Sequence, residues 1–424
     1  MGRSDLPISR PAEPPASGAS AETGAPVARV LPREPRVVFL NQIYPPAFGG
    51  GGQYLALIRK AATRAGIPSL VVTGNRGIPG SGDPDVIRLP TPGGERLPRL
   101  GEYCFALLSP FVLFALRRRY DLIHTMGSAH SVYGAILMGR LLGKPVAVAS
   151  VQNRGDDPAG ILPQRFGHLK NGIFSRASRF ICCSGLQLDT YRTAGYPALK
   201  VRFIPNGCDP ERFVPSPSDE AKSSLRSRLG IPPEGFVMVT LGAIIERKGI
   251  DLLAQAWARF RAGRKDGTLV LVGPNRSSDA GSGVEDAFVD SIRARLAQAG
   301  VADSVIFTGK VSNVPEYLQA ADAFALMSRG EGFPVAILEA MSAGIPFLLW
   351  DLPDYGGYDL KDRVHGFFIP PFDTQLLTGR LSELAADRVA RGRMGEQARL
   401  LAARFSLERS MADHLALYRE MVGE

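Results

Sequence analysis

The feature that most constrains the fold is a short apolar run followed at once by a glycine turn and an amphipathic segment. Residues 323–327 (Ala-Phe-Ala-Leu-Met) are apolar at every position, which is typical of a strand covered on both faces. The turn Arg-Gly-Glu-Gly at 329–332 ends this run, and Pro334 suits the first turn of a helix, where a missing N–H is tolerated. Apolar residues then recur at steps of three from Val335 to Met341. This strand-turn-helix unit predicts an α/β protein built on a parallel sheet.

Two carboxylates lie on either side of this turn. Glu331 lies in the strand-to-helix loop, at the carboxyl edge of the expected sheet, where open α/β folds bind ligands. Glu339 lies about two turns into the helix among apolar neighbours, so its carboxylate needs a partner. A sugar or ribose diol would supply one by donating hydroxyl hydrogens. The spacing alone leaves open the alternative that both are solvated surface charges.

The same strand-and-helix unit recurs along the chain in two groups, and each group predicts one doubly wound domain. The expected strands are 36–41, 69–73, 122–125, 145–151, 179–183 and 201–204 in the first group, and 236–241, 269–272, 305–308, 323–327 and 346–350 in the second. The expected organisation is a disordered Pro/Ala/Gly/Ser-rich tail at 1–34, an N-terminal domain at 35–213, a Pro/Ser-rich linker at 214–234, a C-terminal domain at 235–405 and a C-terminal helix at 406–424.

A glycine run follows the first expected strand and precedes a clear helical pattern. Gly50, Gly51 and Gly52 therefore lie where bare backbone N–H groups and a helix N-terminus can meet an anion. Neither a P-loop Lys-Ser/Thr nor a dinucleotide fingerprint accompanies the run, so a flexible turn is the alternative.

The composition of the chain is that of an ordinary soluble globular protein, with 424 residues, 45% of them hydrophobic and 21% charged. Its four cysteines show no metal-ligand spacing and suit a reducing compartment. No apolar run approaches the roughly 18 residues needed to span a bilayer, and no signal-peptide pattern opens the sequence. These features predict a cytoplasmic protein.

The net charge of +9 is unevenly distributed. Residues 1–210 hold 25 Lys/Arg against 13 Asp/Glu, and residues 211–424 hold 25 against 28. A basic N-terminal half predicts an anionic partner, which is either the inner face of a membrane or a phosphorylated acceptor. No nucleic acid is expected, since the basic residues are dispersed and no reading module accompanies them.

The apolar segment 105–116, followed by Arg117, Arg118 and Arg119, has two interpretations. It is either a core helix or a helix that lies on the inner leaflet with its basic residues beside an apolar face.

The block Glu331-Gly332-Phe333-Pro334, with Glu339 eight residues after Glu331, closely resembles the donor-site signature of retaining GT-B glycosyltransferases, group 1 (family 4-like). The resemblance covers about residues 36–420. It implies two Rossmann-like doubly wound domains that face a central cleft, with the C-terminal helix packed back on the N-terminal domain. It also implies that Glu331 faces the transferred sugar, that Gly332, Phe333 and Pro334 line the donor site, and that Glu339 holds the nucleotide ribose.

Two further segments extend the resemblance. The family's glycine loop, matched by Gly50–Gly52, approaches the donor phosphates. The segment 242–251 resembles the family's diphosphate-binding segment, which implies that Lys248 points a cation at the leaving group. The Arg that usually follows its first Gly is replaced by Ala243, and Arg247 is the candidate to compensate, since a guanidinium binds phosphate well.

His124 ends a strand beside the expected cleft and is a candidate catalytic residue near the acceptor. Relatives commonly carry a second His two residues later, where this chain has Met126. His130 or the loop Gln152-Asn153-Arg154 could serve instead, and a structural role for His124 is the alternative.

The resemblance implies a metal-independent, hexosyltransferase-type enzyme of the polysaccharide or cell-envelope kind. It would transfer a sugar, with retention, from a nucleotide-diphosphate sugar to a hydroxyl of a glycan or lipid-linked acceptor, with no cofactor beyond the donor. Two alternatives remain open, a GT-B epimerase or phosphorylase and a non-catalytic module that binds nucleotide sugar or a partner glycosyltransferase.

Overall fold

The computed structural model describes residues 33–47, 49–74, 82–92, 98–127, 129–279 and 282–423, and residues from Glu34 onward form one compact unit. The disordered tail predicted at 1–34 lies outside the described residues, apart from its last two positions.

The first domain is built on a seven-stranded parallel sheet with the strand order β3-β2-β1-β4-β5-β6-β7. Its strands are β1 (Val37–Leu40), β2 (Ser69–Gly74), β3 (Val86–Leu89), β4 (Leu122–Met126), β5 (Val146–Ala149), β6 (Arg179–Cys182) and β7 (Val201–Phe203). Its helices are α1 (Gly50–Arg64), α2 (Pro98–Ala115), α3 (His130–Leu142), α4 (Pro158–Ile161), α5 (Gly167–Phe174), α6 (Gly185–Thr193) and η1 (Ala198–Lys200).

The second domain is built on a six-stranded parallel sheet with the strand order β10-β9-β8-β11-β12-β13. Its strands are β8 (Val237–Leu241), β9 (Thr268–Val272), β10 (Val305–Gly309), β11 (Ala323–Leu326), β12 (Phe347–Trp350) and β13 (Gly366–Ile369). Its helices are α7 (Asp219–Arg228), η2 (Glu246–Lys248), α8 (Ile250–Ala262), α9 (Asp286–Gln298), η3 (Ala302–Ser304), α10 (Val314–Ala320), α11 (Val335–Ser342), η4 (Pro353–Tyr355), α12 (Thr374–Ala386) and α13 (Arg388–Ala402), and α14 (Leu407–Gly423) ends the chain.

The predicted fold class, two Rossmann-like α/β domains, is confirmed by these two parallel sheets and their covering helices. Of the strands in the described residues, the sequence missed β3 and β13, each of which forms one edge of its sheet. β3 includes the charged Arg88, and β13 begins at Gly366, which has no side chain to favour a strand.

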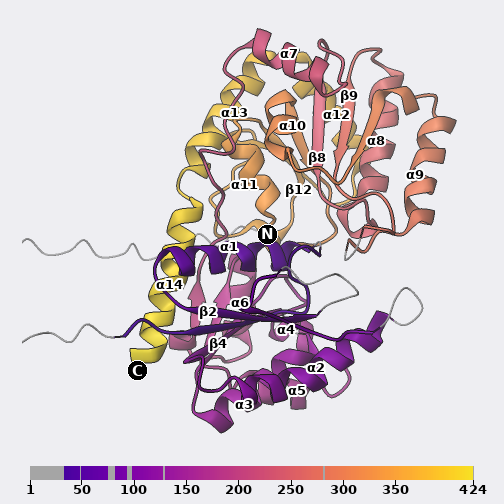
Figure 1. Ribbon diagram of the computed structural model, residues 1–424. Coiled ribbons are helices and arrows are strands. Elements are labelled where there is room, and N and C mark those ends of the chain that lie inside the picture. Colours follow the sequence, from indigo (N-terminus) through magenta and orange to yellow (C-terminus); the bar gives the residue numbers. More distant parts are fainter. Residues whose placement is uncertain are drawn as a thin grey trace, which may run out of the picture. The chain divides into compact units, whose positions relative to one another are not determined.

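Helices cover both faces of the first sheet. In β1, Val37 and Phe39 point to one face and pack against α1 and α14, whereas Val38 and Leu40 point to the other and pack against α2 and α3. Figure 1 shows α1 on one side of this sheet and α2, α3 and α5 on the opposite side. The C-terminal helix α14 therefore packs against the N-terminal sheet. None of the helices in the described residues is long and apolar enough to cross a bilayer.

The segment predicted as a linker, 214–234, contains helix α7. Ser218 caps this helix, because its Oγ accepts from the Ala221 N–H at 3.1 Å. The buried Arg226 then donates to the Asp322 carboxylate at 2.7 Å and ties α7 to the second domain. The Ser-Asp-Glu sequence at 218–220 is a helix start signal that the compositional argument overlooked.

Candidate functional site

The site is built where strand order reverses in the second sheet. The chain runs outward from β8 to β9 and β10, then returns to place β11 on the other side of β8. At such a switch point, the loops that follow the two adjacent strands, here β8 and β11, diverge to opposite faces of the sheet. Ligands bind in the crevice between these loops. The loop after β8 leads to η2 with Arg247 and Lys248, and the loop after β11 carries Glu331. The topology therefore brings together three of the predicted residues, although 83 positions separate Lys248 from Glu331.

Glu331 is the buried centre of this group, with 7% of its surface exposed. Lys248 Nζ donates to its Oε1 at 2.6 Å, and Ser328 Oγ donates to the same atom at 2.6 Å. Arg247 Nη1 lies 3.1 Å from that oxygen. One carboxylate thus holds two cations, and the group keeps a surplus of positive charge.

The pKa of Glu331 reflects this balance. Burial opposes ionisation of the carboxyl, but the charges of Lys248 and Arg247 and the hydrogen bonds outweigh it and hold the pKa of Glu331 below its ordinary value. Glu331 is therefore ionised at neutral pH and positions the two cations.

The loop that carries Glu331 is fixed to η2 and to the first turn of α8. Arg329 binds both carboxylate oxygens of Asp251, at 3.0 and 2.7 Å, and Arg247 Nη1 donates to the Gly330 carbonyl at 2.9 Å. Gly249 permits the close approach, since its φ is +65° and a Cβ there would lie 1.8 Å from the Met327 carbonyl oxygen. The cations and the carboxylate are thus held by a rigid, preorganised frame.

A polar cluster that the sequence did not predict as a unit supports the same loop. Asp354, in η4, accepts from the Glu331 N–H at 3.2 Å and from Asn153 Nδ2 at 2.8 Å. Asn153 Nδ2 also donates to the Gly332 carbonyl at 3.1 Å. Asn153 belongs to the loop at 152–154, the proposed substitute for a second histidine, so this part of the first domain does reach the site loop. Burial raises the pKa of Asp354, although its hydrogen bonds oppose that shift.

Gly332, Phe333 and Pro334 form the connection from this loop into α11. A Cβ at Gly332 would lie 1.9 Å from the Val151 carbonyl oxygen, so the loop needs glycine here. Phe333 is buried and stacks on Tyr358 with ring centroids 3.3 Å apart. Pro334 precedes the first residue of α11, as the sequence predicted for the start of a helix. Gly332 and Phe333 thus have packing roles in the described structure.

Glu339 lies about one turn into α11. It is half-buried and makes no side-chain hydrogen bond to any other described residue. Burial raises the pKa of Glu339 to about 7, and the nearby charge of Arg212 offsets only part of the shift. A carboxylate in this state gains from a ligand that donates hydroxyl hydrogens, as the sequence argument anticipated.

The glycine run opens α1 rather than forming a loop before it, because the helix begins at Gly50 and Gln53 N donates to the Gly49 carbonyl at 3.0 Å. The first-turn N–H groups of an α-helix have no partner within the helix and can bind an anion. Gly51 faces the Val151 side chain, since a Cβ there would lie 3.6 Å from it. Gly51 and Gly332 thus both lie against Val151.

Alanine substitutions in this turn should have opposite outcomes. A Cβ at Gly52 would lie 2.3 Å from the Ile43 carbonyl oxygen, whereas a Cβ at Gly50 meets nothing within 4 Å. We expect Gly52→Ala to lower the free energy of unfolding by about 2 kcal/mol, the usual scale for overpacking. Gly50→Ala should leave it unchanged or raise it by up to about 1 kcal/mol through helix propensity. Urea unfolding measures both, and equal effects would contradict the described start of α1.

The structure does not bring His124 to the other predicted site residues. His124 is fully buried in β4, its Nδ1 lies 2.6 Å from the Tyr418 hydroxyl, and its ring stacks on His414 at 6.0 Å. Burial, aided by His414, holds the pKa of His124 well below its ordinary value, so the ring is neutral. The helix α14 covers the position that the sequence argument placed beside the cleft. His130, the proposed substitute, pairs with Glu102 at 2.7 Å.

The two departures from the family pattern are buried, with Ala243 5% and Met126 8% exposed. In the described residues, no group of three or more His, Cys, Asp or Glu side chains could hold a metal ion.

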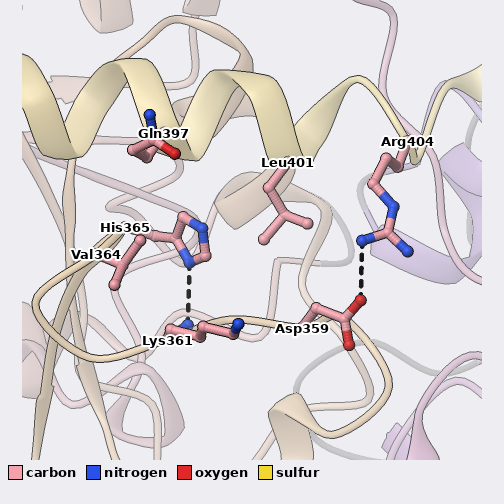
Figure 2. Close-up of a pocket in the computed structure, with 7 residues that line it drawn as sticks. All are labelled: Asp359, Lys361, Val364, His365, Gln397, Leu401 and Arg404. Carbon is pink, nitrogen blue, oxygen red and sulfur yellow. Dashed lines mark hydrogen bonds and ion pairs between the residues drawn. The ribbon is translucent and has the colours of Figure 1, made fainter.

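A cavity of about 420 Å³ lies elsewhere in the second domain, beside α13. Figure 2 shows two hydrogen bonds between residues that line it. His365 Nδ1 accepts from the Lys361 N–H at 3.0 Å, and Arg404 Nη1 donates to Asp359 at 2.9 Å. None of its lining residues belongs to the predicted site, so this cavity is not a candidate for that site.

The fold and the positions of these residues define a GT-B protein of the glycosyltransferase kind. The family described as "Glycosyl transferase 4-like domain" matches residues 49–207, and the family described as "Glycosyl transferases group 1" matches residues 221–401. One match covers each domain. The chain therefore belongs to the group 1 glycosyltransferases.

Two similar proteins are a glycosyltransferase and a synthase. The chain is 30% identical over 226 residues to the D-inositol 3-phosphate glycosyltransferase of Jonesia denitrificans, covering 52% of this chain and 51% of that protein. It is 29% identical over 231 residues to the mannosylfructose-phosphate synthase of Agrobacterium fabrum, covering 51% and 50%. The chain thus spans about half the length of the curated relatives it matches.

Solved structures show the same fold over nearly the whole chain. HepE from Anabaena, in complex with UDP and glucose, superposes with a TM-score of 0.72 at 21% identity and covers 91% of this chain and 99% of its own. Sucrose-phosphate synthase from Thermosynechococcus elongatus gives 0.74 at 21% identity, with 92% and 100% covered.

Proposed function

We propose that the chain is a retaining, hexosyltransferase-type enzyme that moves a sugar from a nucleotide-diphosphate sugar to a hydroxyl of a glycan or lipid-linked acceptor. The observation that carries this proposal is the group formed by Lys248, Arg247 and the buried Glu331 at the switch point of the second sheet. Family membership supports it, as does the binding of UDP and glucose by HepE.

The reaction assigns a role to each of these residues. As the bond between the sugar C1 and the phosphate oxygen breaks, its electron pair goes to the nucleotide diphosphate, and Lys248 and Arg247 stabilise that charge. The first-turn amides at Gly50–Gly52 are a further donor set for the phosphates. Glu331 positions the sugar and favours the positive charge that develops at C1. Glu339 holds the ribose through its hydroxyls.

In this proposal the anomeric configuration is retained because the acceptor attacks C1 of the sugar from the same face that the phosphate leaves. The acceptor oxygen forms the new bond to C1, and its proton passes to an oxygen of the leaving phosphate. Glu331, already held by two cations and the Ser328 hydroxyl, suits an electrostatic role better than that of a covalent nucleophile. Because two protein cations serve the diphosphate, we expect no metal requirement.

A screen of nucleotide sugars tests the function. We expect one UDP-, GDP- or ADP-sugar to stabilise the chain, by about 2.7 kcal/mol at a hundred times its Kd, and to be consumed faster when acceptor is present. The product's anomeric configuration, read by NMR, should match the donor's, and EDTA should not abolish turnover. Lack of stabilisation by any nucleotide sugar would refute the proposal. Donor consumption that acceptors do not change would favour an epimerase.

A further inference from the structure

One face of helix α2 is apolar and exposed. Five large side chains on this face are 42–68% exposed, namely Leu100, Tyr103, Leu107, Phe111 and Phe114. Their spacing of three or four residues places them on one side of the helix. The opposite side supplies the core, where Phe105 and Leu113 are 1% and 0% exposed. The core interpretation of the segment 105–116 therefore holds for one face of the helix, and the membrane interpretation stays a hypothesis for the other face.

Two neighbouring helices carry the same kind of surface. Leu137 and Leu141 on α3 are 46% and 72% exposed, and Phe166 and Leu169 at the start of α5 are 65% and 66% exposed. Helix α3 packs closely on α2 and also contacts α5. Figure 1 shows α2, α3 and α5 side by side on the face of the first sheet opposite α1.

We call these nine side chains the apolar face. They are nine of the sixteen exposed large hydrophobic residues among those the structure describes. Among the described residues of the second domain, helices α7 to α13 carry two exposed large hydrophobic residues, Val389 and Leu400, both on α13. Apolar surface gathered on one face in this way marks an interaction site.

The segments that carry the apolar face are rich in basic residues, and two arginines lie against its rings. The segments 98–119, 130–144 and 163–176 together hold nine Lys/Arg and one acidic residue, Glu102. The Arg117 guanidinium lies 4.4 Å from the Phe114 ring centroid, and that of Arg165 lies 5.1 Å from the Phe166 ring centroid. The Glu102 carboxylate lies 2.7 Å from Nδ1 of His130.

We propose that the apolar face docks on an anionic lipid bilayer. Apolar side chains with arginines at their edge match the boundary between acyl chains and phosphate headgroups. A second copy of this chain is disfavoured as the occupant, because it would bring one basic rim against another. If the proposed function also holds, docking places the first domain where a lipid-linked acceptor is anchored.

Vesicle co-sedimentation of the full chain tests this proposal. We expect binding to phosphatidylcholine vesicles that contain phosphatidylglycerol, weaker binding to pure phosphatidylcholine, and a loss of binding as salt rises. Leu107→Ser with Phe111→Ser should weaken binding at least tenfold, and because both side chains are about two-thirds exposed the fold should survive. Arg117→Gln with Arg118→Gln should weaken it about 25-fold, from about fivefold per basic residue.

The matched control is Val389→Ser with Leu400→Ser. These two side chains are 84% and 61% exposed on α13, outside the apolar face, and their replacement should leave vesicle binding unchanged. Equal recovery of the wild type in the supernatant with and without anionic lipid would overturn the proposal. So would a concentration-dependent dimer in sedimentation velocity that Leu107→Ser with Phe111→Ser abolishes. Donor stabilisation is measured without vesicles, so failure of the docking proposal and failure of the proposed function are separate outcomes.

Discussion

Replacing Lys248 with methionine is expected to lower the kcat of sugar transfer by about 10²–10³-fold, the usual effect of removing one preorganised charge donor. Lys248 Nζ is fixed at 2.6 Å from Glu331 by the frame around the site, so its charge needs no reorganisation as the diphosphate departs. The variant should also bind UDP less tightly, because one of the two cations that we propose bind the diphosphate is gone. Steady-state kinetics and calorimetric titration with UDP measure the two effects.

Glu331→Gln should lower kcat without weakening the binding of UDP. It removes one negative charge from a group that otherwise holds two cations, so UDP should bind as tightly as in the wild type or more tightly. Turnover should nevertheless fall, because the carboxylate no longer favours the positive charge at C1. An interaction made mainly in the transition state affects kcat, whereas uniform binding affects KM.

A purely structural ion pair would behave differently. Breaking a buried pair leaves one uncompensated charge and destabilises the fold, whereas replacing both partners is often neutral. Urea unfolding of Lys248→Met, Glu331→Gln and the double variant provides this control. If both single variants lose stability and UDP affinity in parallel, and the double variant recovers both, Lys248 and Glu331 serve the fold rather than the reaction.

The central part of the site was predictable because it depends on local patterns. β11 is apolar throughout and β8 has one polar residue, Thr240, and the loops that follow them contain glycine and charged residues. A parallel sheet places such loops at one edge, so Lys248 and Glu331 could be assigned to a common region without coordinates. What the pattern could not supply was the direct contact between them.

Contacts that depend on packing between distant segments were not predictable. Asn153 meets Asp354 across 201 positions of sequence, and nothing local to either residue indicates the other. The same limit explains His124. Its strand was predicted, but the ring is covered by Tyr418 and His414 of α14, which lie nearly 300 positions later. The sequence does not show that α14 covers the end of β4. His124 was therefore predicted to be open to the site, whereas the structure buries it.

Donor affinity is expected to rise with pH, by about 30-fold between pH 5.5 and pH 8, if Glu339 holds the ribose. Burial raises the pKa of Glu339 to about 7. In the chain without donor, the Glu339 carboxyl is therefore mostly protonated at pH 5.5 and mostly ionised at pH 8. Two ribose hydroxyls can donate to the carboxylate but not equally to the acid, and binding therefore favours the ionised form. Glu331, whose pKa lies below its ordinary value, does not titrate in this range.

The free chain should show the opposite trend in stability. The pKa of Glu339 is raised from 4.5 to about 7 on folding, so its contribution to stability is fully present below about pH 4.5 and is lost as pH rises through 7. Glu339→Gln should remove this loss and also flatten the pH dependence of donor affinity. At pH 8 it should weaken donor binding about 10- to 100-fold, on the scale of hydrogen bonds to a charged group, with little change in kcat.

Calorimetric titration with an intact nucleotide sugar suits this test, because its diphosphate diester carries no group that titrates between pH 5.5 and pH 8. Proton release on binding, measured in buffers of different ionisation enthalpy, should be greatest near pH 6 and absent in Glu339→Gln. An affinity that is independent of pH in the wild type would contradict the contact between Glu339 and the ribose. A pH dependence that persists unchanged in Glu339→Gln would assign the titration to another group and leave α11 with a structural role alone.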